Sequence, residues 1–136
     1  MGPSPHETIS TNSDLRFVLH EHFTKRHHFD FRLEKDGVLK SWAIPKGLPD
    51  RPKDRRLAIE TEDHELSYIS FEGLIPEGDY GAGEVKIADS GTYNIIDWLP
   101  DKIEIILSGK RFFGTYIFVR FQRAGKGQWI ILKKEK

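Results

Sequence analysis

The chain has 136 residues, a length that fits one domain and allows roughly two-thirds of the unfolded surface to be buried on folding. It contains no cysteine, which excludes disulfides and cysteine-ligated zinc sites, so any metal must be bound by histidine, carboxylate or backbone oxygen. Its net charge is zero, which argues against a uniformly basic nucleic-acid binder.

The charges are nevertheless segregated along the chain. Residues 1–56 carry a net charge of +3, residues 57–100 carry −9, and residues 101–136 carry +6. A neutral protein with charges separated in this way can present a basic face to phosphates, although ordinary surface variation would give the same pattern. The distribution therefore leaves a nucleic-acid substrate open.

The first residues differ in composition from the rest. Residues 1–14 are polar, with two prolines and no lysine or arginine, so we expect a disordered tail there. Residues 15–136 are expected to form a single domain without internal repeats. No apolar run approaches 18 residues and the N-terminus has no secretory signal pattern, so we expect a soluble cytoplasmic protein with no membrane partner.

The remaining sequence predicts short strands. The first is expected at Phe17–His22, and the next two, His28–Glu34 and Val38–Ile44, flank Asp36-Gly37, which is typical of a type I′ hairpin turn. Glu65–Phe71 is predicted to form one short helix. The other expected strands are Arg56–Thr61, Glu84–Ala88, Thr92–Asp97, Lys102–Leu107, Thr115–Phe121 and Trp129–Lys133.

Glycine-rich turns are expected to separate these strands. Ser90-Gly91 resembles a tight turn, and we interpret Gly78, Gly81 and Gly83 as a structural turn with demanding backbone angles rather than a phosphate cradle. Many short strands with such turns predict an all-β fold, a small barrel or sandwich with at most one short helix.

The first hairpin can be interpreted residue by residue. Side chains alternate faces along a strand, so His28, Asp30 and Arg32 share one face while the intervening apolar side chains share the other. A two-residue turn would pair Asp30 with Ala43, and this small partner leaves open space above the carboxylate. The strand should therefore have one packed face and one face that bears an imidazole, a carboxylate and a guanidinium.

His22 on the preceding strand completes a His-x5-His-x-Asp pattern with His28 and Asp30. Two imidazoles and a carboxylate suit a divalent transition metal that keeps positions open for water and substrate. A solvated outer sheet face would explain the alternation of the second strand alone. The surrounding basic residues favour phosphate chemistry, and they are Lys25, Arg26, Lys46, Arg51, Lys53, Arg55 and Arg56.

Three stretches of the chain match a known family in order and spacing. They are FVLHEHFTKRHHFDFRLEKDGVLKSWAIPKG, RRLAIETEDHELSYISFEG and IPEGDYGAGEV. They resemble the 3′-phosphoesterase module of the DNA ligase D repair system, from about Phe17 to about Tyr93 and more loosely to the C-terminus. The resemblance implies a compact antiparallel β-barrel with a concave active-site face.

The resemblance also implies a manganese-dependent enzyme that heals nucleic-acid 3′ ends. A diesterase step removes a terminal 3′ ribonucleoside and leaves a 3′-phosphate, and a monoesterase step then yields a 3′-hydroxyl. The chain has no room for polymerase or ligase domains, so we expect a stand-alone, monomeric member that works with a separate ligase and polymerase. Residues 1–15 lack the basic Arg-Asp segment of the family's bacterial members, which puts the balance of the two steps in doubt.

Carried over by motif, the resemblance assigns His22, His28 and Asp30 as metal ligands and Arg32 as an arginine beside them. It assigns five further positions to the reaction: Lys46, Arg56, Glu62, His64 and Tyr68. His64, in EDH, matches a histidine that contacts the reacting phosphate. His20 shares a face with His22 and could support the metal ligands from behind, although we favour an ordinary strand position.

Two other functions remain open. His28, Asp30 and His64 could form the 2-His-1-carboxylate set of a non-haem iron oxygenase, although this leaves His22 and Lys46 without a role. The chain could also be a non-catalytic barrel that grips nucleic-acid ends through its basic residues. Metal-dependent release of phosphate would separate the enzyme from the binding protein.

Overall fold

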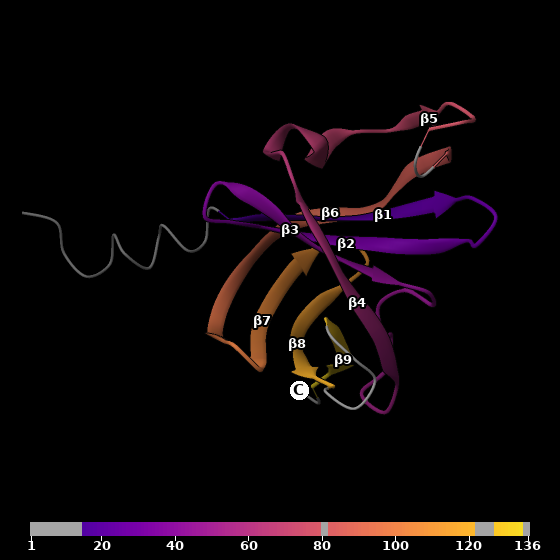
Figure 1. Cartoon of the computed structure of the whole chain (residues 1–136). Coiled ribbons are helices and arrows are strands. Elements are labelled where there is room, and N and C mark those ends of the chain that lie inside the picture. Colours follow the sequence, from indigo (N-terminus) through magenta and orange to yellow (C-terminus); the bar gives the residue numbers. More distant parts are fainter. Residues whose placement is uncertain (1–14, 80–81, 122–126, 135–136) are drawn as a thin grey trace, which may run out of the picture.

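The computed structural model describes residues 15–79, 82–121 and 127–134, and Figure 1 shows that they form an almost entirely β-structured fold. The strand bounds are β1 Arg16–Phe23, β2 His28–Lys35, β3 Val38–Ile44, β4 Arg55–His64, β5 Gly73–Ile75, β6 Gly83–Leu99, β7 Lys102–Gly109, β8 Phe113–Arg120 and β9 Gln128–Lys133. One 3₁₀ helix, η1 (Leu66–Ser70), lies between β4 and β5. The expected all-β fold is confirmed.

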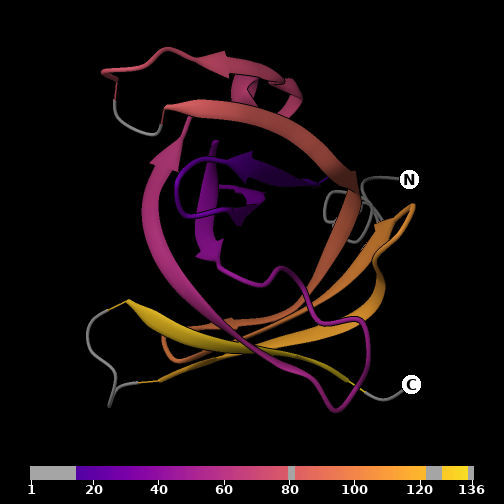
Figure 2. The same ribbon diagram turned by 90° about the vertical axis from the view of Figure 1, so that its right-hand side faces the viewer.

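Eight of these strands close into an antiparallel barrel. They hydrogen-bond in the order β1-β2-β3-β4-β9-β8-β7-β6, and β6 pairs with β1 to complete the ring, while β5 pairs only with the first residues of β6. β4 and β6 each change partner along their length, β4 from β9 to β3 and β6 from β1 to β7. In Figure 2 these two long strands form outer arcs around β1 and β2.

The predicted hairpin and its register are confirmed. Asp36 and Gly37 have φ values of 54° and 82°, the pair of positive angles that a type I′ turn requires. Asp30 lies opposite Ala43, and Arg32 lies opposite Ser41 on β3. The turn chemistry thus determines which side chains of β2 face the barrel interior.

Apolar side chains from all parts of the ring fill the barrel. Phe31 and Leu33 of β2 are fully buried there, and the ring of Phe31 stacks on that of Phe118 with centroids 6.0 Å apart. Trp42 of β3 also packs against Phe118, with ring centroids 4.8 Å apart. Burying one such side chain contributes about 1.5–3 kcal/mol, so this face of the hairpin holds the sheet closed.

The expected turn at Ser90-Gly91 is wrong. β6 runs without interruption over Gly83–Leu99, so the two strands predicted on either side of that dipeptide are one strand. A Cβ atom on Gly91 would lie 2.2 Å from the carbonyl oxygen of Ser108 on β7. The glycine is needed for the close approach of two backbones rather than for a reversal of the chain.

Gly83 has a structural role, as we expected when we interpreted this glycine-rich segment as a turn with demanding backbone angles. Its φ of 136° favours glycine, and a Cβ atom there would lie 2.2 Å from the carbonyl oxygen of Phe23 at the end of β1. Gly78 also has a positive φ, of 97°, whereas Gly81 lies outside the described residues. Gly83 therefore allows β6 to begin directly against β1.

The segment that follows β4 covers the barrel wall. η1 contacts β1 and β3, the two neighbours of β2, and Figure 1 shows it above this part of the sheet. The short helix expected at Glu65–Phe71 is confirmed in position, as a single 3₁₀ segment. Within the described ranges no helix is long and apolar enough to span a bilayer. The tail predicted for residues 1–14 falls outside them.

Candidate metal and phosphate site

β1 and β2 present a polar face on the side opposite the core. The alternation that turns the phenylalanines of β2 inward turns His28, Asp30 and Arg32 to this face. β1 adds His20, which pairs with Asp30, and His22, which pairs with His28. All of these residues except His28 are at most 8% exposed. Buried polar groups require partners, and they find them in one another.

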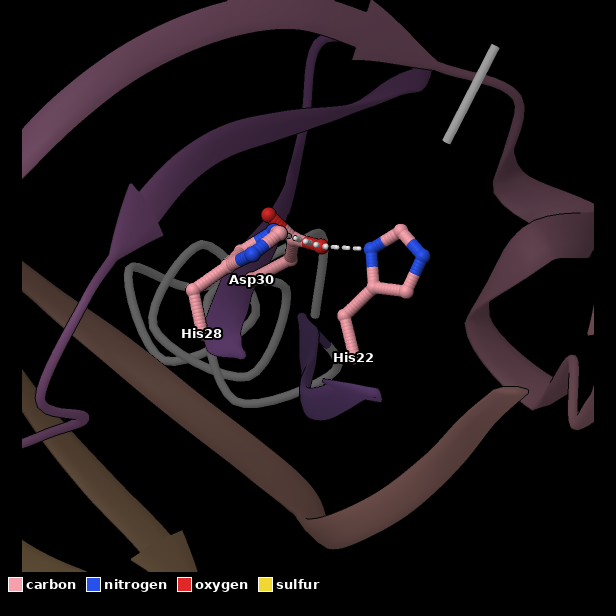
Figure 3. A group of neighbouring side chains, drawn as sticks. All are labelled: His22, His28 and Asp30. Carbon is pink, nitrogen blue, oxygen red and sulfur yellow. Dashed lines mark ion pairs between the residues drawn. The ribbon is translucent and has the colours of Figure 1, made fainter. Parts of the chain in front are cut away.

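His22, His28 and Asp30 converge on one point (Figure 3). Nδ1 of His22 lies 3.5 Å from Oδ2 of Asp30, and Nε2 of His28 lies 3.3 Å from the same oxygen. The three potential ligand atoms all lie within 4.8 Å of one another. Nδ1 of His28 donates a hydrogen bond to the carbonyl oxygen of Arg26 at 2.8 Å, which orients the ring with Nε2 toward the carboxylate.

This donor set fits a metal ion. Two atoms bound to one ion at about 2.1 Å lie roughly 3.0–3.6 Å apart at ordinary coordination angles, which is the spacing observed around Oδ2 of Asp30. Imidazole nitrogens with a carboxylate oxygen suit manganese and other divalent transition metals. His22, His28 and Asp30 would hold such an ion and leave further coordination positions for water and substrate. The metal itself stays a prediction.

The protonation equilibria of this group favour an anionic carboxylate. Burial alone would raise the pKa of Asp30, but the hydrogen bond with His28 and the charge of Arg32 hold it below its ordinary value. The hydrogen bond with Asp30 raises the pKa of His28. Because a metal needs the neutral imidazole, an ion bound here would compete with that proton.

Arg32 links the histidine–aspartate group to the rest of the polar face. Its Nη2 lies 3.6 Å from Oδ2 of Asp30, and its Nη1 donates to Oγ of Ser41 at 2.9 Å. Its Nε donates to Nδ1 of His20 at 3.1 Å. Its Nη1 also lies 3.1 Å from Nδ1 of His64 at the end of β4. The guanidinium is therefore fixed from several directions.

The contacts of His64 involve only one of its ring nitrogens. Nδ1 lies 3.1 Å from Nη1 of Arg32, which can only donate, and 3.2 Å from the carbonyl oxygen of Glu62, which can only accept. Burial, and then the charge of Arg32, lower the pKa of His64, so the imidazole is neutral near pH 7. Nε2 is the ring nitrogen that neither contact uses, and it can donate to a phosphate oxygen in the tautomer that carries its proton there.

The ring of Tyr68, on η1, packs against the side chains that surround Arg32. Its ring lies 5.0 Å from the ring of His64 and 5.3 Å from that of His20, and the guanidinium carbon of Arg32 lies 5.0 Å from its centroid. Burial raises the pKa of Tyr68, so its hydroxyl stays protonated and can donate a hydrogen bond. Tyr68 thus lies beside His64 and Arg32, and its assignment to the reaction stays a prediction.

His20 is the site residue that the sequence interpretation undervalued. It is fully buried, accepts from Nε of Arg32 at Nδ1, and donates from Nε2 to the carbonyl oxygen of Phe71 at 3.0 Å. Burial and the charge of Arg32 lower its pKa to about 4, so it is neutral. Its shared strand face with His22 was the available signal.

Of the other three predicted residues, two lie at a second cavity, whereas Glu62 lies beside His64, with its carbonyl oxygen 3.2 Å from Nδ1 of that ring. Lys46 and Arg56 line a small cavity of about 60 Å³ together with Phe29, whose side chain belongs to the core face of β2. Arg56 also pairs with Asp54 at 3.7 Å. The side chain of Glu62 is exposed on β4. Their assignment to the reaction stays a prediction.

Comparison with known proteins identifies the family of this chain. The family model for the DNA ligase D 3′-phosphoesterase domain matches residues 20–120, a range that contains all of the predicted site residues. The multifunctional non-homologous end joining DNA repair protein LigD of Mycobacterium tuberculosis is 48% identical over 122 residues, covering 87% of this chain and 16% of the relative.

Two further relatives carry the name multifunctional non-homologous end joining protein LigD. That of Mycolicibacterium smegmatis is 40% identical over 139 residues, covering 94% of this chain and 18% of the relative. That of Pseudomonas aeruginosa is 42% identical over 125 residues, covering 88% and 15%. The chain thus spans about a sixth of the length of these relatives. It belongs to the DNA ligase D 3′-phosphoesterase domain family.

Proposed function

We propose that this chain is a manganese-dependent phosphoesterase that heals the 3′ ends of nucleic-acid strands. It first removes a terminal ribonucleoside as a phosphodiesterase and then removes the remaining 3′-phosphate as a phosphomonoesterase. The main support is that Arg32 connects a candidate metal site to candidate phosphate donors. It lies 3.6 Å from Asp30 on one side and 3.1 Å from His64 on the other.

The side chains around Arg32 match what phosphoryl transfer needs. A bound manganese ion would polarise a phosphoryl oxygen and make a bound water more acidic. The guanidinium of Arg32, the hydroxyl of Tyr68 and, in the tautomer protonated there, Nε2 of His64 would donate to the oxygens on which negative charge develops. The hydrogen bonds to Ser41 and His20 hold the guanidinium in place before substrate binds.

The two steps use the same site on different bonds. In the diesterase step, a water oxygen bonds to phosphorus, the bond to the 5′-oxygen of the terminal ribonucleoside breaks, and that oxygen takes up a proton. The product strand ends in a 3′-phosphate. In the monoesterase step, a second water attacks the same phosphorus and the strand's own 3′-oxygen leaves. A 3′-hydroxyl and inorganic phosphate remain, and a ligase or polymerase can use the hydroxyl.

The oxygenase grouping has less support. It requires His28, Asp30 and His64 as ligands, but the carboxylate lies between His22 and His28, while Nδ1 of His64 faces the guanidinium of Arg32. A permanent cation beside that nitrogen opposes metal binding there. A non-catalytic barrel that binds nucleic-acid ends would use the same surface as the enzyme. Only an experiment can therefore distinguish the two functions.

The test uses the full chain, manganese and a 5′-labelled strand that ends in one ribonucleotide, with products resolved at single-nucleotide length. We expect a strand shortened by one residue and ending in 3′-phosphate, followed by its 3′-hydroxyl form. Chelation of the metal and the His22→Ala variant should each abolish both products. A strand that is bound but stays intact with manganese would instead support the non-catalytic barrel.

A further inference from the structure

The turn between β1 and β2 carries an exposed aromatic pair beside the candidate metal site. Phe23 ends β1, and its ring lies 5.1 Å from the ring of His27 at an interplanar angle of 30°. Phe23 is 41% exposed, and the side chain of His27 is 47% exposed. Among the described residues no second ring and no cation packs against Phe23, so the rest of its ring is open to a ligand.

The aromatic pair is fixed from the side of the core. Nε2 of His27 lies 2.8 Å from Oε2 of Glu21, and the His27 ring lies 5.4 Å from that of Phe29, which packs against the core. β6 holds the backbone of Phe23, since a Cβ atom on Gly83 would meet its carbonyl oxygen. A ligand would therefore meet a ring that is already in position, which lowers the ordering cost of binding.

The same turn carries two cations whose side chains have no partner within the described ranges. Lys25 and Arg26 are exposed, and neither side chain takes part there in a hydrogen bond, an ion pair or a cation–π contact. The segment from Phe23 to His27 contains no carboxylate. Cations that neutralise phosphates release condensed counterions, which favours binding of a nucleic-acid strand. The turn thus offers charges for phosphates beside an aromatic ring for a base.

The turn begins and ends at candidate metal ligands. His22 precedes Phe23 and His28 follows His27, and the two ligands form the last residue pair of the β1–β2 ladder. Figure 1 shows the turn at the outer end of this hairpin. Alternation directs Phe23 to the side opposite the ligands, but the two sides of the hairpin meet at its tip. A strand whose 3′ end lies at the metal can therefore cross the tip with its next nucleotides.

We propose that the β1–β2 turn binds the processed strand on the 5′ side of its reacting end. Phe23 stacks on one nucleobase, and Lys25 and Arg26 bind the phosphates beside it. This inference rests on the proposed function for its substrate. Single exposed hydrophobic residues are common, and what distinguishes Phe23 is its position between two cations and a candidate metal ligand. Stacking on an aromatic ring tolerates every base, as healing of ends of any sequence requires.

Removing single bases from the ligand tests the stack. The full chain, with a chelator present, is titrated into a labelled single-stranded DNA that ends in 3′-phosphate, and binding is followed by anisotropy. Abasic nucleotides placed one at a time from the 3′ end keep the phosphates and remove one base each. We expect one position at which the abasic nucleotide weakens binding on the order of tenfold. Equal affinity for the complete strand and all abasic strands would overturn the proposal.

Substitutions of Phe23 assign that base to its ring. Phe23→Leu keeps an apolar side chain against His27 but removes the aromatic ring, so it should bind the complete strand as weakly as the parent binds the abasic one. Phe23→Tyr keeps the ring and should bind like the parent. Phe113→Leu is the matched control, because Phe113 is 61% exposed on β8, which pairs with neither β1 nor β2. Parental affinity in Phe23→Leu, or an equal loss in Phe23→Tyr, would overturn the stack.

The salt dependence of binding tests the two cations. For single strands the logarithm of the affinity falls with the logarithm of the salt concentration, with a slope of about −0.7 for each neutralised phosphate. Lys25→Gln and Arg26→Gln should each make the slope shallower by about 0.7, for complete and abasic strands alike. Phe113→Leu should leave the slope unchanged. A parental slope in both glutamine variants would overturn the assignment of phosphates to the turn.

The outcomes distinguish this inference from the proposed function, because binding is measured without metal. Phe23 adjoins His22, so manganese affinity and thermal unfolding are measured for Phe23→Leu, and both should match the parent. Loss of the metal in this variant would overturn a direct role of the ring. Base-dependent binding without phosphate release under manganese would sustain the turn and refute the enzyme. Phosphate release without base-dependent binding would do the reverse.

Discussion

Arg32 shows how one side chain can organise a site before substrate binds. It is 4% exposed, so its charge has lost most of its water, and each nitrogen of its guanidinium faces another polar side chain. Burial lowers the pKa of Arg32, yet an arginine stays charged even so. The charge of the buried guanidinium is compensated by the carboxylate of Asp30.

Replacing this arginine by lysine tests whether activity needs the forked geometry of the guanidinium or only its positive charge. Arg32→Lys keeps the cation but cannot reach Ser41, His20 and Asp30 at once, because an ammonium is a point donor on a flexible stem. We expect kcat to fall on the order of 10²–10³-fold, the usual cost of a lost transition-state donor. Steady-state rates on a 3′-phosphate strand measure it, and full activity would reduce Arg32 to a structural ion pair.

His64 and His22 should separate phosphate handling from metal binding. His64 contacts Arg32 rather than the Asp30 carboxylate, so His64→Ala should bind manganese about as well as the parent. It should still turn over roughly 10²–10⁴-fold more slowly, as expected for a lost acid, base or donor. His22→Ala should lose the metal itself.

The measurements for this pair are titration calorimetry with manganese and single-turnover rates on both substrates. The loss in His64→Ala need not be equal for the two steps, since one leaving group is a nucleoside hydroxyl and the other is the strand's own 3′-oxygen. If His64→Ala loses the metal as fully as His22→Ala, then His64 is a ligand, and the grouping with His28 and Asp30 regains support.

At the scale of elements, the hydrogen bond from His20 to Phe71 joins β1 to the segment that carries η1. That segment places Tyr68 over Arg32, so the bond holds a donor in position through the backbone. His20 is buried and neutral, and its pKa of about 4 lies below the ordinary value of 6.5. Acid should therefore loosen this connection.

The sign of the pH effect follows from proton binding. Between pH 6.5 and about 4 the unfolded chain protonates His20 and the folded chain does not, so stability falls as the pH falls through this window. The loss should be on the order of 2–3 kcal/mol. His28, whose pKa is raised, contributes in the opposite direction. The comparison with His20→Gln, which removes only this titration, isolates the effect.

Urea unfolding of the metal-free chain at pH 7 and at pH 4.5 provides the measurement. The parent should lose more free energy of unfolding over this interval than His20→Gln does. A glutamine can still accept from Arg32 or donate to Phe71, so the variant should fold. An identical pH dependence in both proteins would mean that His20 titrates in the folded state as it does in the unfolded state.

The first hairpin was predictable because local rules determine it. Asp36-Gly37 sets the turn, the turn sets the register, and alternation then places His28, Asp30 and Arg32 on one face. No local rule shows that His20 would be covered by a segment 51 residues later, so its hydrogen bond to Phe71 could not be predicted. Single-residue motifs likewise could not place Lys46, which lines a different cavity from Arg32.

At the scale of the whole molecule, the strand pattern alone leaves closure of the barrel open, and the family resemblance predicted it correctly. A barrel and a sandwich contain the same short strands, and the pairing of β1 with β6 joins residues some 60 or more positions apart, such as Phe23 and Glu84. That pairing brings His22 against β6 and completes the wall beside the candidate metal site. The change of partner along β6, from β1 to β7, occurs around Gly91.

The last prediction concerns that change of partner. Gly91 does not have a positive φ, but a Cβ atom there would lie 2.2 Å from the backbone carbonyl oxygen of Ser108, so Gly91→Ala must push β6 and β7 apart. We expect a loss of about 1–3 kcal/mol in the free energy of unfolding, as for other overpacked sites. Gly37→Ala is the matched control, since its Cβ atom meets nothing within 4 Å and its cost comes only from a φ of +82°.

Amide hydrogen exchange distinguishes the two substitutions even where their stabilities are similar. Gly91→Ala should speed exchange along β6 and β7 and weaken manganese binding by His22, because β1 is held in the ring by β6. Gly37→Ala should affect only the β2–β3 turn and leave those amides protected. Unchanged stability and exchange in Gly91→Ala would show that the two backbones can separate without cost, so that barrel closure at this point does not determine the geometry of the site.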